Sequence, residues 1–177
     1  MSDVALISGS LRQQSLNTAL LRRAAGLFPH DVETEFVRID DLPLYSPDGE
    51  LAQPAAVERL RAQLAAAAAV VVSTPEYNGS VTGALRNALD WASRPYGQSC
   101  LAGKPVAVIA VVPSPRAAEW ARLELVRSLE VIGARPVGHF GLGGEDTAAL
   151  AAGTLTEGAA AGLRDLLAGL ALQPARA

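Results

Sequence analysis

The residues best suited to chemistry near the N-terminus are hydroxyl groups and one arginine that follow a short apolar run. This run, residues 4–8, ends at Gly9, which permits a tight turn. Groups that can bind an anion come next, just before a helical pattern begins: Ser10, Arg12, Ser15 and Asn17. A helix N-terminus attracts anions through its unpaired N–H groups and its dipole. The stretch therefore predicts a site for a phosphate-bearing ligand.

Two other interpretations of this first loop were weighed. A dinucleotide-binding turn needs a Gly-x-Gly-x-x-Gly run, and the loop after Gly9 lacks the second and third glycines. The Walker pattern is missing as well, so a terminal monophosphate suits the loop better than a bridging pyrophosphate. Alternatively, Ser15 and Asn17 only start a helix as capping residues.

A second group of polar and aromatic residues follows the apolar run at residues 69–73. Pro75 and Gly79 frame a rigid turn, whose main-chain groups can bind the edge of a planar heterocycle. Tyr77 offers an aromatic face, and Asn78 offers a donor and an acceptor. Glu76 is either an exposed turn residue or a catalytic group, and Tyr77 could instead belong to a packing or subunit surface.

The elements that must position these loops alternate along the whole chain. Strands are expected at residues 4–8, 33–39, 69–73, 106–112 and 136–140, and helices at about 16–27, 57–64, 82–93, 121–132 and 155–170. The runs 69–73 and 106–112 are almost continuously apolar, as central parallel strands are. This order predicts an α/β fold, a doubly wound five-stranded parallel sheet in a single domain over residues 1–177, with the ligand at the carboxyl ends of the strands.

Composition excludes several classes of function. Half of the 177 residues are hydrophobic, which argues against disorder. The formal net charge of −3 argues against nucleic acid or an anionic membrane as the main partner. Cys100 is the only cysteine, so no intrachain disulfide is expected and a reducing, cytoplasmic location is favoured. No signal peptide and no apolar segment of roughly 18 residues is found. The spacing of His, Cys and carboxylates gives no metal site.

Two motifs in the expected order make the chain resemble the NADPH-dependent FMN reductase family, the flavodoxin-like quinone, azo and chromate reductases. They are Gly9-Ser10-Leu11-Arg12-x-x-Ser15-x-Asn17 and Thr74-Pro75-Glu76-Tyr77-Asn78-Gly79-Ser80. The second motif continues to Trp91, and the loop at residues 41–45 is also similar. The likeness covers most of the first 112 residues and is topological beyond them.

The resemblance implies a flavodoxin-like fold, FMN as cofactor and NADPH or NADH as electron donor. It assigns the FMN phosphate to Ser10, Arg12, Ser15 and Asn17, and it counts Leu16 among the FMN-binding residues. It assigns the edge of the isoalloxazine ring to Pro75, Glu76, Tyr77, Asn78 and Gly79. It further implies hydride transfer through the flavin to a quinone, azo, flavin or metal-oxyanion acceptor by a ping-pong mechanism. No catalytic side chain is expected, because the flavin does the chemistry.

Some expectations remain open at this stage. Many relatives have a glycine-rich turn after the fourth strand, whereas this chain has prolines and Arg116 at residues 112–118. Arg116 could contact the flavin, contact the nicotinamide phosphate, or simply face solvent.

We expect a homodimer or homotetramer, with the helix at 82–93 and Trp91 near the interface. The alternatives are an FMN-binding electron-transfer module and a flavin-free domain that binds another phosphate ligand.

Overall fold

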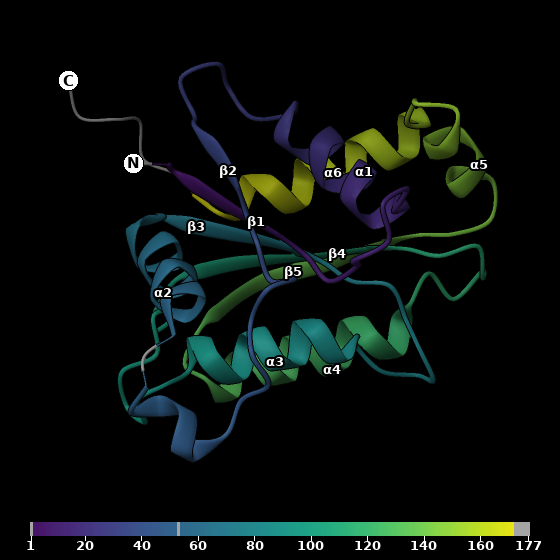
Figure 1. Cartoon of the computed structure of the whole chain (residues 1–177). Coiled ribbons are helices and arrows are strands. Elements are labelled where there is room, and N and C mark those ends of the chain that lie inside the picture. Colours follow the sequence, from purple (N-terminus) through teal and green to yellow (C-terminus); the bar gives the residue numbers. More distant parts are fainter. Residues whose placement is uncertain (1, 53, 172–177) are drawn as a thin grey trace.

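The computed structural model describes residues 2–52 and 54–171, which form one five-stranded sheet between two layers of helices (Figure 1). The strands are β1 (Val4–Ser8), β2 (Thr34–Val37), β3 (Ala69–Ser73), β4 (Pro105–Val111) and β5 (Arg135–Leu142). All neighbours pair in parallel, in the order β2-β1-β3-β4-β5. This is the flavodoxin-like order, and it confirms the predicted fold class.

Alternating side chains of the central strands fill two separate hydrophobic cores. On β1, Ala5 and Ile7 face one core, while Val4 and Leu6 face the other. The same alternation continues along β3 and β4, where every residue from Val106 to Val111 is at most 2 % exposed. Continuous apolar runs are required because both faces of these strands are covered.

Three helices cover each face of the sheet (Figure 1). One layer contains α2 (Ala55–Ala66), α3 (Gly83–Ala92) and α4 (Glu119–Val131), and the opposite layer contains α1 (Leu16–Ala25), α5 (Glu145–Ala151) and α6 (Glu157–Ala168). The N-terminus of α1 and the chain leaving β3 therefore meet near the winding reversal between β1 and β3. Ligands of doubly wound sheets bind at this place.

The predicted strands and long helices are confirmed, but two short elements were missed. The sequence pattern predicts neither the 3-10 turn η1 (Pro47–Glu50) nor α5. Helix α5 has only seven residues and its sequence, Glu-Asp-Thr-Ala-Ala-Leu-Ala, carries too few large apolar side chains to show a helical period. Strand β2 is shorter than expected, because it lies at the edge of the sheet and pairs with β1 alone.

Trp91 is buried within its own chain, and its place near a subunit interface stays a prediction. Its side chain is only 2 % exposed within its own chain. The indole N–H donates to the Pro43 carbonyl at 2.8 Å, and the ring meets Tyr45 edge-on with centroids 5.2 Å apart. Trp91 thus packs α3 against the loop after β2. A buried tryptophan with a satisfied N–H is a core residue.

Candidate functional site

The loops that follow β1 and β3 touch at the winding reversal. The Gly9 N–H donates to the Ser73 carbonyl at 2.7 Å, and the Thr82 hydroxyl donates to the Gly9 carbonyl at 2.6 Å. A Cβ atom at Gly9 would lie 3.1 Å from the Ser73 oxygen, so the close approach favours glycine. Both sequence motifs therefore belong to one site.

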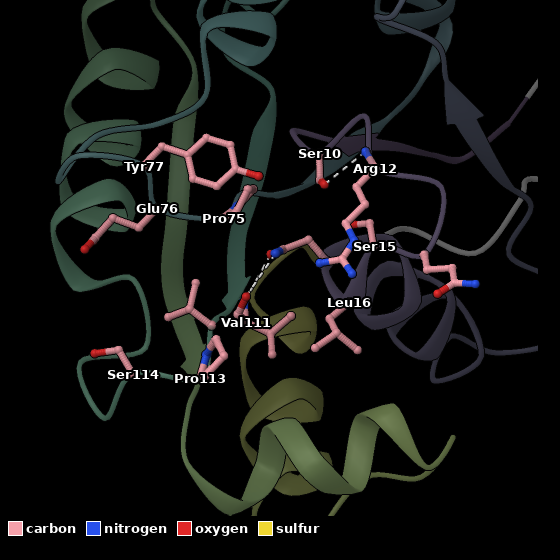
Figure 2. A pocket seen from close by; sticks show the side chains of 13 residues that line it. Ser10, Arg12, Ser15, Leu16, Pro75, Glu76, Tyr77, Val111, Pro113 and Ser114 are labelled. Atoms are coloured by element: carbon pink, nitrogen blue, oxygen red, sulfur yellow. Dashed lines mark hydrogen bonds between the residues drawn. The ribbon is translucent and has the colours of Figure 1, made fainter.

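A pocket of about 350 Å³ opens where these loops meet (Figure 2). Its volume lies in the range typical of small-molecule sites. The loop after β4 closes its third side. The lining residues are Ser10, Arg12, Gln14, Ser15, Leu16, Asn17, Pro75, Glu76, Tyr77, Val111, Val112, Pro113 and Ser114.

One end of the pocket is built for an anion. Ser15 is the N-cap of α1, and its hydroxyl accepts from the Thr18 N–H at 3.2 Å while keeping its own proton to donate. The N–H groups of Leu16 and Asn17 belong to the first turn, where an α-helix offers them no carbonyl partner. Ser10 and Arg12 lie on this side of the pocket (Figure 2). The donor set is rich in N–H, hydroxyl and guanidinium groups, as a phosphate requires.

The Asn17 side chain has a structural role that its position in the motif did not indicate. Its oxygen accepts from the Ser73 hydroxyl at 2.8 Å and from the Val111 N–H at 3.1 Å. Its amide nitrogen donates to the Val111 carbonyl at 2.9 Å, and the residue is 4 % exposed. Asn17 therefore ties α1 to the ends of β3 and β4, and the bond to Val111 uses one of the two hydrogens of its side-chain amide.

The other end of the pocket is apolar. Pro75 comes directly after β3, and Val111 and Pro113 come from the end of β4 and the loop that follows it. Tyr77 is 57 % exposed, and its ring reaches across from Pro75 toward the side of Ser10 (Figure 2). A polar end and an apolar end in one pocket suit a ligand that joins a phosphate to a planar ring.

Asn78 and Gly79 do not line the pocket. They form the tip of a tight turn, with φ angles of +53° and +74°. Tyr77 and Ser80 exchange main-chain hydrogen bonds of 3.0 and 3.1 Å across this tip. A Cβ atom at Gly79 would lie 3.2 Å from the Trp120 ring, so the turn rests on α4. The two residues shape the turn, whereas Pro75, Glu76 and Tyr77 are among the residues that line the pocket.

Glu76 is neither an exposed turn residue nor a carboxylate aimed into the pocket. Its side chain points away from the cavity (Figure 2), and one oxygen accepts from the Ala121 N–H at 3.0 Å. Ala121 lies in the first turn of α4. A carboxylate at this position satisfies an unpaired helix N–H and complements the helix dipole. The negative charge is thus directed away from the anion-binding end.

The proline-containing loop after β4 packs closely on β5. Ala117 and Ala118 have φ angles of +50° and +55°, which are left-handed for residues other than glycine. A Cβ atom at Gly141 would lie 2.4 Å from the Ala117 oxygen, and one at Gly143 would lie 2.4 Å from the Ser114 oxygen. Gly141 and Gly143 therefore leave space for the loop after β4. In many relatives the glycines are expected in this loop itself.

Arg122 holds this loop in place. Its Nε donates to the Ala117 carbonyl at 2.8 Å, and its Nη1 lies 2.6 Å from His139 Nδ1. Because arginine can only donate, the Nδ1 atom of His139 must carry no proton and accept this hydrogen bond. Partial burial, and then the charge of Arg122, lower the pKa of His139. Arg116 does not line the pocket; its guanidinium lies 4.8 Å above the Trp120 ring centre.

Several lining residues were not among the predicted site residues. They are Gln14, Val111, Val112, Pro113 and Ser114. The resemblance drew attention to the loop after the fourth strand as a departure from the family pattern, but the sequence could not say which of its residues face the pocket. Cys100 lies outside the pocket, and burial raises the pKa of its thiol. It donates to the Ala92 carbonyl at 3.3 Å, as a packing residue does.

The order of the strands defines a flavodoxin-like α/β protein. Its pocket lies at the winding reversal and has an anion-binding end and an apolar end, as a nucleotide-type site does. The family model described as NADPH-dependent FMN reductase matches residues 2–147. The chain belongs to this family.

The names of similar proteins agree with membership of this family. The chain is 47% identical over 106 residues to a 2-hydroxy-1,4-benzoquinone reductase of Burkholderia sp, and 47% identical over 112 residues to a quinone reductase of Pseudomonas putida. These matches cover 60% and 63% of this chain. They cover 58% and 60% of the two relatives, so the chain matches less than two thirds of their length.

A solved structure extends the likeness to nearly the whole chain. The flavoenzyme NAD(P)H:(acceptor) oxidoreductase FerB from Paracoccus denitrificans superposes with a TM-score of 0.84 at 34% sequence identity. The superposition covers 97% of each chain. The similarity therefore extends over nearly the whole chain, beyond the residues 2–147 that the family model matches.

Proposed function

We propose that this chain binds FMN in the pocket at the winding reversal and acts as an NAD(P)H-dependent oxidoreductase. The observation that carries the proposal is the pocket itself, in which the hydroxyl-rich start of α1 and the apolar turn after β3 face each other. Family membership and the names of the relatives support the same conclusion. When bound, FMN supplies the hydride-accepting and hydride-donating chemistry.

Phosphate binding falls to Ser10, Arg12, Ser15 and the main-chain N–H groups of Leu16 and Asn17. Ser15 can donate its proton while its lone pair holds the Thr18 N–H, so capping and ligand binding do not compete. Arg12 adds a charge that a neutral ligand would not need. Asn17 contributes position, since its side chain fixes the start of α1 relative to β3 and β4.

The residues at the apolar end orient the ring and exclude water from its edge. Pro75, Glu76 and Tyr77 present main-chain groups on one side, and Val111 and Pro113 provide apolar contact on another. Asn78 and Gly79 act indirectly by closing the turn. No side-chain acid or base is needed, because Glu76, the carboxylate nearest this end, is bonded to α4.

Donor and acceptor would use the same pocket mouth in succession, which gives a ping-pong mechanism. Quinones are the acceptor class favoured here, since relatives at 47% identity are named for them. Azo compounds, free flavins and metal oxyanions are further acceptors that an open mouth would admit. NADPH is the proposed donor, with NADH as the alternative.

The chain would work as a homodimer or homotetramer in the cytoplasm, without nucleic-acid or membrane partners. Across the described residues, no helix is long and apolar enough to cross a membrane. Cys100 is present as a free thiol, which fits a reducing compartment. Light scattering at working concentration tests the assembly, and a monomeric mass would contradict it.

Steady-state kinetics test the proposed activity. NADPH oxidation with a benzoquinone acceptor should be lost when flavin is stripped from the protein and should return when FMN is added back. Double-reciprocal plots at several quinone concentrations should be parallel. Oxidation that is independent of FMN would contradict the proposal. Intersecting lines would contradict the ping-pong order alone.

A further inference from the structure

The turn at residues 75–81 is too small to hold its own shape. Its tip is a two-residue connection with both central residues in left-handed conformations, closed by the Tyr77–Ser80 pair of main-chain hydrogen bonds. An isolated two-residue hairpin of this kind is at best marginally stable in water. The turn must therefore be held by neighbouring elements if it is to present fixed main-chain groups to a ring.

Helix α4 holds both sides of this turn through carboxylates. On the entering side, Glu76 accepts from the Ala121 N–H at 3.0 Å. On the leaving side, Glu124 Oε2 accepts from the Ser80 hydroxyl at 2.6 Å and from the Val81 N–H at 3.2 Å. Both contacts join the turn to a single rigid helix on the far side from the pocket.

The Glu124 carboxylate is held in its charged form by its surroundings. Partial burial opposes ionisation, but the Ser80 hydroxyl, the Val81 N–H and Arg86 together lower the pKa of Glu124. Arg86, from α3, pairs with Oε1 and also donates to the Ser128 hydroxyl at 3.0 Å. Hydrogen bonds to an ionised acceptor are stronger than neutral ones. Glu124 therefore links α3, α4 and the turn through one partly buried network.

We propose that Glu124 is a positioning residue for the ring-binding turn, which it holds in the geometry that receives the isoalloxazine without touching the ligand. The inference rests on the proposed function, because it assigns the ring end of the same FMN site. Glu124 is not among the residues that line the pocket, and Glu76, which also ties the turn, does line it. Glu124 can therefore be changed without altering the surface that meets the ligand.

A positioning role for Glu124 predicts how flavin affinity should change when the residue is replaced. Loosening the turn should weaken every ligand that carries the ring, because a preorganised site loses affinity when it must be ordered on binding. The phosphate end, held by Ser15 and Asn17, should be unaffected. The ratio of FMN affinity to riboflavin affinity should then stay at its wild-type value, whereas damage at the phosphate end would change it.

The test compares Glu124→Gln and Glu124→Ala with Glu130→Gln, which removes an exposed carboxylate from the same helix. Flavin fluorescence titration should show FMN and riboflavin both weakened in the Glu124 variants by about tenfold, the effect of losing a charged hydrogen bond. Hydrogen exchange of the ligand-free proteins should be faster at the amides of residues 76–81 and unchanged at residues 15–18. Glu130→Gln should match wild type in both measurements.

Each outcome separates the two proposals. Unchanged riboflavin affinity and unchanged exchange at residues 76–81 in folded Glu124→Gln would overturn the positioning role and leave FMN binding intact. A loss for FMN but not for riboflavin would also overturn it, since that pattern belongs to the phosphate end. Should Glu124→Ala fail to fold, Glu124→Gln, which keeps the side-chain shape, decides the result. A wild-type protein that binds neither flavin would overturn both proposals.

Discussion

At the residue scale, the anion end of the pocket depends on a small number of side chains with separate tasks. Ser15 caps α1, Asn17 ties that helix to two strands, and Arg12 is left to carry the charge. The motif alone could not separate these tasks, because all three residue types can donate to a phosphate. Burial and hydrogen-bond partners distinguish a side chain that is occupied from one that is available.

The Arg12→Ala variant tests the charge directly. We expect FMN binding to weaken by roughly tenfold to hundredfold, because a charged hydrogen bond contributes about 1.5–3 kcal/mol. Riboflavin, which lacks the phosphate, should bind as it does to wild type. Fluorescence titration measures both constants, with Arg22→Ala, an exposed arginine further along α1, as the matched control. Equal losses for FMN and riboflavin would remove Arg12 from the phosphate site.

The contact between His139 and Arg122 predicts a pH dependence of stability. The pKa of His139 is lowered by partial burial and by Arg122, so below the ordinary value of 6.5 the unfolded chain binds the proton more readily than the folded one. The free energy of unfolding should therefore rise with pH up to about 6.5 and gain nothing further from this group above it.

Thermal unfolding of wild type and His139→Gln between pH 5 and 8 isolates this contribution. The variant keeps a neutral acceptor for Arg122 but cannot titrate, so the difference in melting temperature between the two proteins should change with pH below 6.5. Parallel pH profiles for the two proteins would show that His139 does not couple to folding.

At the element scale, the long elements could be predicted because their patterns are continuous. The apolar runs of β3 and β4 reflect burial on both faces, and the helical period of α1 reflects packing on one. Helix α5 and η1 were missed because they are short and carry few large apolar side chains. The shape of the loop after β4 could not be read from its own sequence, since Gly141 and Gly143 on the neighbouring segment decide it.

The turn after β3 shows how one backbone conformation can be tested against a nearby control. Gly79→Ala should destabilise the protein by about 1–2 kcal/mol, because an alanine in the left-handed region is strained and its Cβ would press on Trp120. Gly83→Ala, at the start of α3, meets nothing within 4 Å and should be neutral or stabilising, since alanine favours a helix. Chemical denaturation measures both free energies.

Riboflavin affinity adds a functional readout to this pair. Gly79→Ala should weaken riboflavin, as the turn that borders the ring is displaced, while Gly83→Ala should leave riboflavin binding unchanged. The same loss of stability in both variants would contradict the assigned role of the left-handed turn.

At the scale of the whole molecule, the winding of the sheet makes the site. The order β2-β1-β3-β4-β5 sends α1 to one face and α3 to the other, so the loops after β1 and β3 diverge and leave a crevice between them. The sequence predicted this architecture and therefore placed two distant motifs together. The close fit of the β4 loop on β5 and the network of Glu124 arise from long-range contacts that no local pattern contains.

The central claim is that this pocket holds FMN in a form that NADPH can reduce. The most direct test is an anaerobic visible spectrum of the FMN-reconstituted, desalted protein before and after NADPH is added. We predict that the flavin absorption bands survive desalting and bleach on addition of NADPH. Bands that survive but persist unbleached with both NADPH and NADH would contradict the reductase and favour an electron-transfer module. Loss of all flavin on desalting, with no binding at micromolar FMN, would contradict the FMN site itself.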